Sequence, residues 1–164
     1  MARTIGDVFT DDIVPGLNFT FLPVPGGGGK DCERADVFEA CAIDATSCVG
    51  GCTGKTARQL AGFVSCFEHS FNESSREHNC DIRFDVGTKC AVAAGIHAGM
   101  ETCLASPDRQ KKVTAWINAT QAAASPKIQF WPWVHVNGKL DSDAAQNTTN
   151  LKKELCTAGL KAAC

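Results

Sequence analysis

The segment W-P-W-V-H-V-N-G-K, residues 131–139, limits the fold of this chain more than any other stretch. Its Asn137-Gly138 pair predicts a two-residue hairpin, because a type I′ turn needs positive φ at both central residues. Pro132 cannot donate a backbone hydrogen bond, so it belongs at the start or the edge of a strand. We expect a strand over Val134–Val136, a tight turn and a second strand. The peptide before Pro132 is either cis, as an aromatic-Pro-aromatic entry allows, or an ordinary trans bond.

Cysteine is the most informative residue type: ten cysteines in 164 residues is a high and even number. It favours a disulfide-stapled chain in an oxidising compartment over buried free thiols. Zinc would need Cys-x-x-Cys pairs or Cys and His clusters, whereas the pair Cys48/Cys52 has three intervening residues and is not repeated. We therefore predict disulfides, no metal and no cofactor. The candidates are Cys32, Cys41, Cys48, Cys52, Cys66, Cys80, Cys90, Cys103, Cys156 and Cys164.

Within this set we expect Cys156–Cys164 as the first bridge, because the two are close enough to tie down the C-terminus. Cys66 lies beside the apolar face of a predicted helix, so Cys41–Cys66 is the next expected bridge. Cys48 and Cys52 form a conceivable redox pair, but a structural staple is the favoured role. They lie in a glycine-rich loop, and the next predicted helix begins several residues later.

Length and charge limit the class of protein. A chain of 164 residues with a net charge of −2 fits a single domain that does not bind nucleic acid. No apolar run approaches the roughly 20 residues that span a bilayer, so no transmembrane segment is expected. The start, Met1-Ala2-Arg3, predicts no targeting peptide in this chain. Four N-x-S/T sequons favour the secretory pathway, at Asn18, Asn72, Asn118 and Asn147.

Hydrophobic periodicity predicts most of the helices. Residues 4–10, 36–45, 55–71 and 90–104 fit helices, and the alternation over Leu17–Val24 fits a strand. Ser106-Pro107-Asp108 is a strong helix start, followed by one face of Val113, Trp116, Ile117, Thr120 and Ala124. A last helix begins at Thr148 or Thr149 and stops at Gly159.

Several short segments in the same order resemble the gamma-interferon-inducible lysosomal thiol reductase family. The hairpin of residues 131–139 resembles the family's P-W-V-x-V-N-G-K and is the most specific match. The other matching segments are L-N-F-T at 17–20 with Pro23, F-E-A-C-A-I-D at 38–44, F-V-S-C-F-E at 63–68 and the cysteines Cys156 and Cys164.

The resemblance implies an α/β, thioredoxin-like fold that lacks its first strand. It implies one domain over 1–164, with a core of 1–25 and 106–164 and a helical, cysteine-rich insert of 32–105. Trp131, Pro132 and Trp133 would then line a substrate groove or cis-proline loop, although core packing is the favoured role of the two tryptophans. The missing strand would be central, so upstream residues or another chain adding a strand would have to complete the sheet.

Two departures bear on activity. The family's C-x-x-C would fall immediately before Met1, and of its C-Q-H-G-x-x-E-C only the loop Gly26–Gly29 and Cys32 have counterparts. We therefore assign no catalytic residue and expect a structural or interaction subunit with other protein chains as partners. It would lie in a secretory, lysosomal or organelle lumen, for example on the lumenal side of a membrane complex. The competing hypothesis is a thiol–disulfide oxidoreductase whose C-x-x-C lies upstream.

Overall fold

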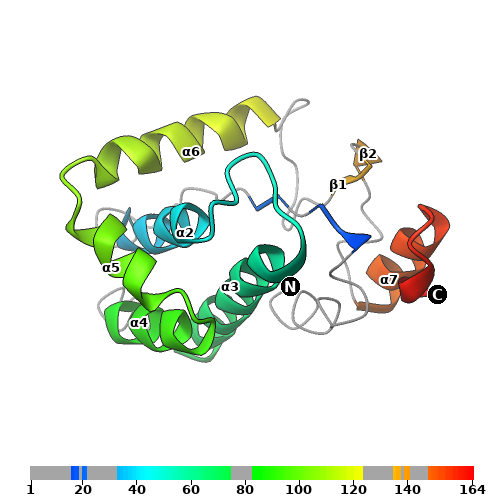
Figure 1. Cartoon of the computed structure of the whole chain (residues 1–164), viewed down its shortest axis with the longest axis horizontal. Helices are drawn as coiled ribbons and strands as arrows, with labels where there is room; N and C mark the ends of the chain where they lie inside the picture. Colours follow the sequence, from blue (N-terminus) through cyan, green and yellow to red (C-terminus); the bar gives the residue numbers. More distant parts are fainter. Residues whose placement is uncertain are drawn as a thin grey trace.

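Helices dominate the part of the chain that the computed structural model describes (Figure 1). They are α2 Glu33–Ala45, α3 Gly54–Ser74, α4 Arg83–Ala93, α5 His97–Ala105 and α6 Arg109–Ala123. A hairpin of β1 His135–Val136 and β2 Lys139–Leu140 follows, then α7 Thr148–Thr157 and the 3-10 turn η3 Lys161–Ala163. The structure describes residues 16–18, 20–21, 33–74, 83–123, 135–137, 139–140 and 148–164.

The longest described helix, α3, forms where the periodicity predicts an amphipathic helix over residues 55–71. Apolar residues three and four positions apart share one face of a helix. That face is buried here, and full burial of a side chain such as Leu60 or Val64 contributes about 1.5–3 kcal/mol. The prediction is confirmed. The buried members of the predicted face are Ala57, Leu60, Ala61, Val64 and Phe67.

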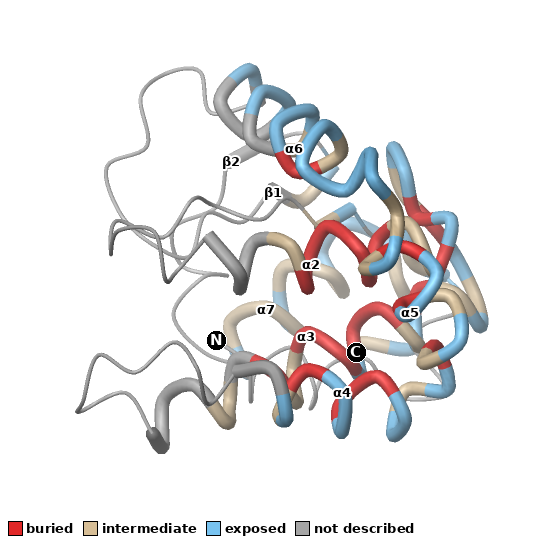
Figure 2. Tube along the Cα trace, turned by 90° about the vertical axis from the view of Figure 1, so that its left-hand side faces the viewer, coloured by how far each residue is buried: buried red, intermediate tan, exposed pale blue. Residues whose placement is uncertain are grey.

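Helix α2 supplies the facing part of the core and confirms the helix predicted over residues 36–45. Phe38, Cys41 and Ile43 are at most 1% exposed. The ring of Phe38 lies 5.8 Å from the ring of Phe67 in α3, a distance at which aromatic pairs attract. The helical body, which we define as residues 33–123 in α2 to α6, therefore encloses one apolar cluster. Figure 2 shows its buried residues on the inward sides of these helices.

Three helices end in the same hydrogen-bonded turn, with a residue of positive φ just beyond the helix. Ser47 follows α2 with φ of 55°, Gly95 follows α4 with 68°, and Gly159 follows α7 with 100°. In each turn the next backbone N–H donates to a carbonyl five residues earlier, at 2.9–3.0 Å. Gly159 confirms the predicted stop. Gly95 corrects the single helix predicted over residues 90–104, because it ends α4 and lets α5 begin separately.

Helix α6 begins where Ser106-Pro107-Asp108 predicts a start. The Asp108 backbone N–H donates to Ser106 Oγ at 3.2 Å, and the helix follows from Arg109. Val113 is 3% exposed and Trp116 packs against the apolar cluster, as two members of the predicted face should. The prediction assigned α6 to the 106–164 core, and in the structure α6 packs on α2 of the predicted insert.

The structure overturns the predicted α/β, thioredoxin-like fold. Leu17, Asn18, Thr20 and Phe21 belong to no strand, although their alternation predicted one. The physical reason lies in Phe21, which packs partly buried against the helical cluster, so its apolar surface is covered by helices rather than by a sheet. Within the described ranges, the two-stranded hairpin is the only sheet.

The hairpin forms where the Asn-Gly pair predicts it. His135 pairs with Leu140 and Val136 pairs with Lys139 in antiparallel register. Asn137 has φ of 51°, the positive value that the first central residue of a type I′ turn needs. Pro132 lies outside the described residues, so the isomer of its peptide bond stays a prediction.

Candidate functional site

Every cysteine in the described part of the chain is bonded to another. The prediction of a disulfide-rich chain is confirmed, and such pairing is typical of an oxidising, secreted-type environment. Cys32 and Cys80, the other two candidates, lie outside the described residues. The four bridges are Cys41–Cys103, Cys48–Cys52, Cys66–Cys90 and Cys156–Cys164.

The pairing confirms one expected bridge and corrects another. Cys156–Cys164 forms as predicted, with Cα atoms 5.0 Å apart. The expected Cys41–Cys66 bridge is wrong: Cys41 bonds Cys103, and Cys66 bonds Cys90. The reason is the packing of the helices. Helix α2 packs against α5 more extensively than against any other described helix, and α3 packs mainly along α4, so each cysteine meets the helix that its own helix packs against.

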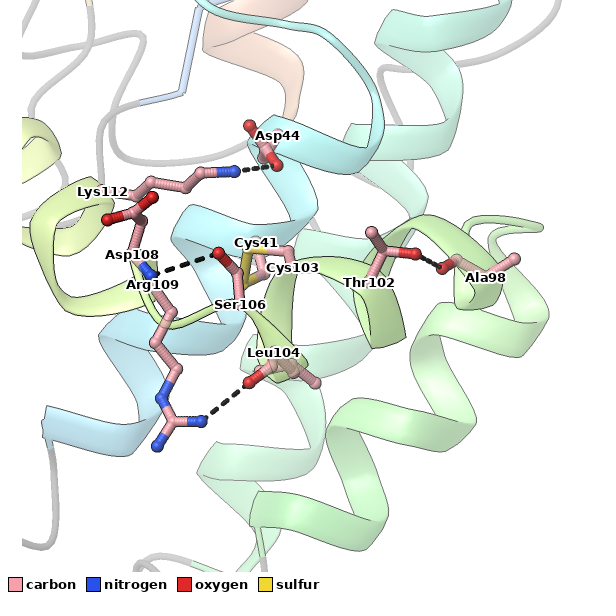
Figure 3. Close-up of a disulfide and its surroundings, with 10 residues drawn as sticks. All are labelled: Cys41, Asp44, Ala98, Thr102, Cys103, Leu104, Ser106, Asp108, Arg109 and Lys112. Carbon is pink, nitrogen blue, oxygen red and sulfur yellow. Dashed lines mark hydrogen bonds and ion pairs between the residues drawn. A yellow bond between two sulfur atoms is a disulfide. The ribbon is translucent and has the colours of Figure 1, made fainter.

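Three helices meet around Cys41–Cys103 (Figure 3). The disulfide joins α2 to α5, and Lys112 Nζ of α6 lies 2.6 Å from Asp44 Oδ2 of α2. Arg109 Nη1 donates to the carbonyl of Leu104 at 2.8 Å, which satisfies one of the last carbonyls of α5. The junction is therefore held by a covalent bond, an ion pair and a helix-end hydrogen bond.

A second cross-link closes the loop between α2 and α3. Cys48 is 1% exposed and Cys52 is 8% exposed. Val49, which lies between them in sequence, is 65% exposed. The segment that contains Asn18 and Thr20 covers this loop. A Cβ on Gly51 would lie 2.5 Å from Asn18 Oδ1 and 2.9 Å from Thr20 Oγ1, so only glycine fits beneath them. The bond fixes a crowded loop, which fits the predicted staple.

An open cavity of about 390 Å³ lies between α2, α4 and α5. Ligand pockets are usually more enclosed, with apolar walls around a few polar groups, whereas this cavity is open to solvent. Phe38, Met100 and Leu104 supply most of the apolar wall. His97 Nε2 and Glu101 Oε1 lie 3.5 Å apart, one turn apart on α5, and both side chains are partly exposed. The lining is Phe38, Gly87, Thr88, Ala91, His97, Met100, Glu101, Leu104 and Ala105.

Close helix packing shapes this cavity. A Cβ on Gly87 would lie 2.5 Å from the ring of Phe38, so that ring rests directly on the backbone of α4. A Cβ on Gly99 would lie 2.9 Å from the Cβ of Ala45, so α5 also approaches α2 closely. Gly99 lies in the 90–104 segment, which is rich in small residues that allow such close packing. No local pattern in the sequence indicates the cavity itself, because its lining comes from three separate segments.

The structure does not describe the residues of the predicted groove. Trp131, Pro132 and Trp133 lie outside the described residues, so the structure does not test their role. Of the sequons, Asn147 also lies outside, and Asn72 lies in α3 without a described side chain. The other two, Asn18 and Asn118, are both exposed.

In the described ranges, no group of three or more His, Cys, Asp or Glu side chains is arranged to hold a metal ion. None of the described helices is both long enough and apolar enough to cross a membrane. The comparisons with known proteins returned no relative: no family model, curated protein or solved structure matches the chain. The family resemblance of the hairpin and its neighbouring segments therefore stays a prediction.

Proposed function

We propose that this chain is a non-catalytic structural or interaction subunit of a larger protein assembly in an oxidising lumen. The observation that carries the proposal is the disulfide framework of the helical body. Cys41–Cys103 spans a sequence separation of 62 and Cys66–Cys90 one of 24. In the chain-entropy account, loops of these lengths disfavour the unfolded chain by about 4 and about 3.5 kcal/mol.

The location of the sulfur atoms supports a structural role for these two bridges. Cys41 and Cys90 are each 1% exposed and Cys103 is 2% exposed, whereas Cys66 is partly buried. Thiol–disulfide exchange needs a thiolate to reach a disulfide sulfur, so buried bridges exchange slowly. Bridges that persist hold the helices in one arrangement. A surface held in this way loses little conformational entropy when a partner binds, which is the advantage of a preorganised interaction module.

The test is the state of the natural protein. We expect it to co-elute with other protein chains in native size-exclusion chromatography, and to be cross-linked to them by a lysine-reactive reagent. Disulfide mapping of the same sample without reduction should return the four bridges. A natural protein that elutes alone at its own mass, with no cross-linked partner, would contradict the proposal.

The thiol–disulfide oxidoreductase with an upstream C-x-x-C remains the competing prediction, and no described residue bears on it. It differs in a measurable way, because it requires reduction of insulin by the natural protein with its true N-terminus. Activity that disappears when an upstream cysteine is changed to serine would replace the subunit proposal. Sequencing the natural N-terminus in the same experiment shows whether such a cysteine exists.

A further inference from the structure

The sequon Asn118-Ala119-Thr120 lies in α6, and its asparagine is on the side of the helix that faces away from the core. Successive residues of an α-helix are about 100° apart, so Asn118 lies about 140° from Val113 and about 160° from Trp116 around the axis. Val113 is buried and Trp116 packs against the apolar cluster. Asn118 itself is exposed and belongs to a stripe of exposed residues along α6, whose exposed stretches are drawn pale blue in Figure 2. The described exposed residues of this stripe are Lys111, Thr114, Ala115, Asn118, Ala119 and Ala122.

We propose that Asn118 is an N-glycosylation site whose glycan projects from the outer face of α6. The proposal rests on the lumenal location that is part of the proposed function, because the modification takes place in that compartment. Asparagine in N-x-S/T is the acceptor of this bulky and solubilising group. An asparagine on the outer face of a packed helix can carry it without displacing any core side chain.

Asn18, the other described sequon asparagine, offers less room. Its Oδ1 and the Oγ1 of Thr20 both lie against Gly51, close to where a Cβ would be. A glycan on Asn18 would have to leave alongside the Cys48–Cys52 loop and would compete with this contact. On α6, by contrast, the residues one turn before and one turn after Asn118, Thr114 and Ala122, are themselves exposed.

The oligosaccharide is transferred to Asn118 from a lipid-linked donor. The carboxamide nitrogen of Asn118 forms a bond to the anomeric carbon of an oligosaccharide, and the bond from that carbon to a lipid diphosphate breaks. The lipid diphosphate leaves with the electron pair, and one amide proton passes to a base of the transferase. No oxidant or reductant takes part. The glycan then occupies the outer face of α6, so a partner chain would have to bind elsewhere on the helical body.

The deciding experiment is peptide mapping of the natural protein after treatment with peptide-N-glycosidase, which converts a glycosylated asparagine to aspartate. We expect aspartate at position 118, and no conversion in an untreated sample. If Asn118 is unmodified in a sample that contains the disulfides, the glycosylation proposal is wrong, and the proposed lumenal location is not contradicted. A natural protein with neither bridges nor glycan would overturn both.

Variants expressed through a eukaryotic secretory pathway give a second readout. Asn118→Gln and Thr120→Ala should each remove one glycan, while Thr120→Ser keeps the sequon and should keep the glycan. Asn150→Gln is the matched control, since Asn150-Leu151-Lys152 is not a sequon and the glycan number should not change. If Asn118→Gln carries as many glycans as the unsubstituted chain, the proposal is wrong. The disulfide map of each variant verifies that the chain has folded.

Discussion

The helical body and the C-terminal part, residues 148–164, use disulfides in different ways. In the body, two bridges join helices that are far apart in sequence, and the joined helices enclose a core. In the C-terminal part, Cys156–Cys164 spans a sequence separation of only eight, from α7 to the residue after η3, and none of residues 149–164 is buried. The same covalent bond therefore stabilises tertiary structure in one region and a local turn in the other.

Removing one bridge from each region gives the largest expected effects. The double variant Cys41→Ala/Cys103→Ala should lose about 4 kcal/mol of unfolding free energy, and Cys156→Ala/Cys164→Ala about 2.5 kcal/mol, because the shorter loop restricts the unfolded chain less. Urea unfolding of both oxidised proteins, followed by circular dichroism, measures the difference. Equal losses would contradict the distinction between the two regions.

Matched leucine truncations sharpen the comparison. Leu60→Ala in α3 removes a fully buried side chain and should cost about 2–5 kcal/mol, the range for a leucine cavity in a core. Leu151→Ala in α7 removes a half-buried side chain, so we expect a loss of under about 1.5 kcal/mol. The measurement is the denaturant midpoint at constant slope. A larger loss at Leu151 would show that the C-terminal part, not the helical body, dominates stability.

Two glycines test how closely the helices of the body approach each other. Gly99→Ala places a Cβ 2.9 Å from that of Ala45, and such overpacking costs about 1–3 kcal/mol, more than the roughly 1 kcal/mol gained in helix propensity. Gly62→Ala is the control: it lies in α3 with open space around it, and should stabilise the protein by about 0.5–1 kcal/mol. Thermal unfolding should therefore shift in opposite directions, and a stabilised Gly99→Ala would refute the close contact.

The smallest effect is expected at the ion pair between α2 and α6. Asp44 and Lys112 are 38% and 35% exposed, so solvent screens their attraction and the coupling should be at most about 1 kcal/mol. A double-mutant cycle with Asp44→Asn and Lys112→Met measures it. The coupling should shrink when the salt concentration is raised, whereas a salt-independent value would indicate that the contact acts through packing.

Features encoded locally could be predicted from the sequence. The spacing of α3, the Ser106 start of α6, the Asn137-Gly138 turn and the Cys156–Cys164 bridge each depend on a few neighbouring residues. Gly95 does not by itself specify a helix end, because glycine also occurs within helices at a modest energetic cost. Ser47 carried none, because serine rarely adopts the positive φ that it has here.

Features that depend on which segments meet in space could not be predicted in this way. The bridge from Cys41 goes to Cys103 rather than Cys66 because α2 lies along α5, and no local pattern specifies that neighbour. The alternation of apolar and polar residues around Phe21 is compatible with a strand in a sheet, but the apolar side chain can equally be covered by helices. The cavity beside His97 and Glu101 depends on three helices at once, so its discovery required the structure.

The Cys41–Cys103 bridge encloses two others in sequence, Cys48–Cys52 and Cys66–Cys90. During synthesis Cys41 emerges before Cys103 and encounters several nearer thiols first. Any bond that Cys41 forms to one of those thiols has to be broken before the native pair can form, and uncatalysed reshuffling takes up to hours. The order of cysteines along this chain therefore predicts that a disulfide isomerase speeds its maturation.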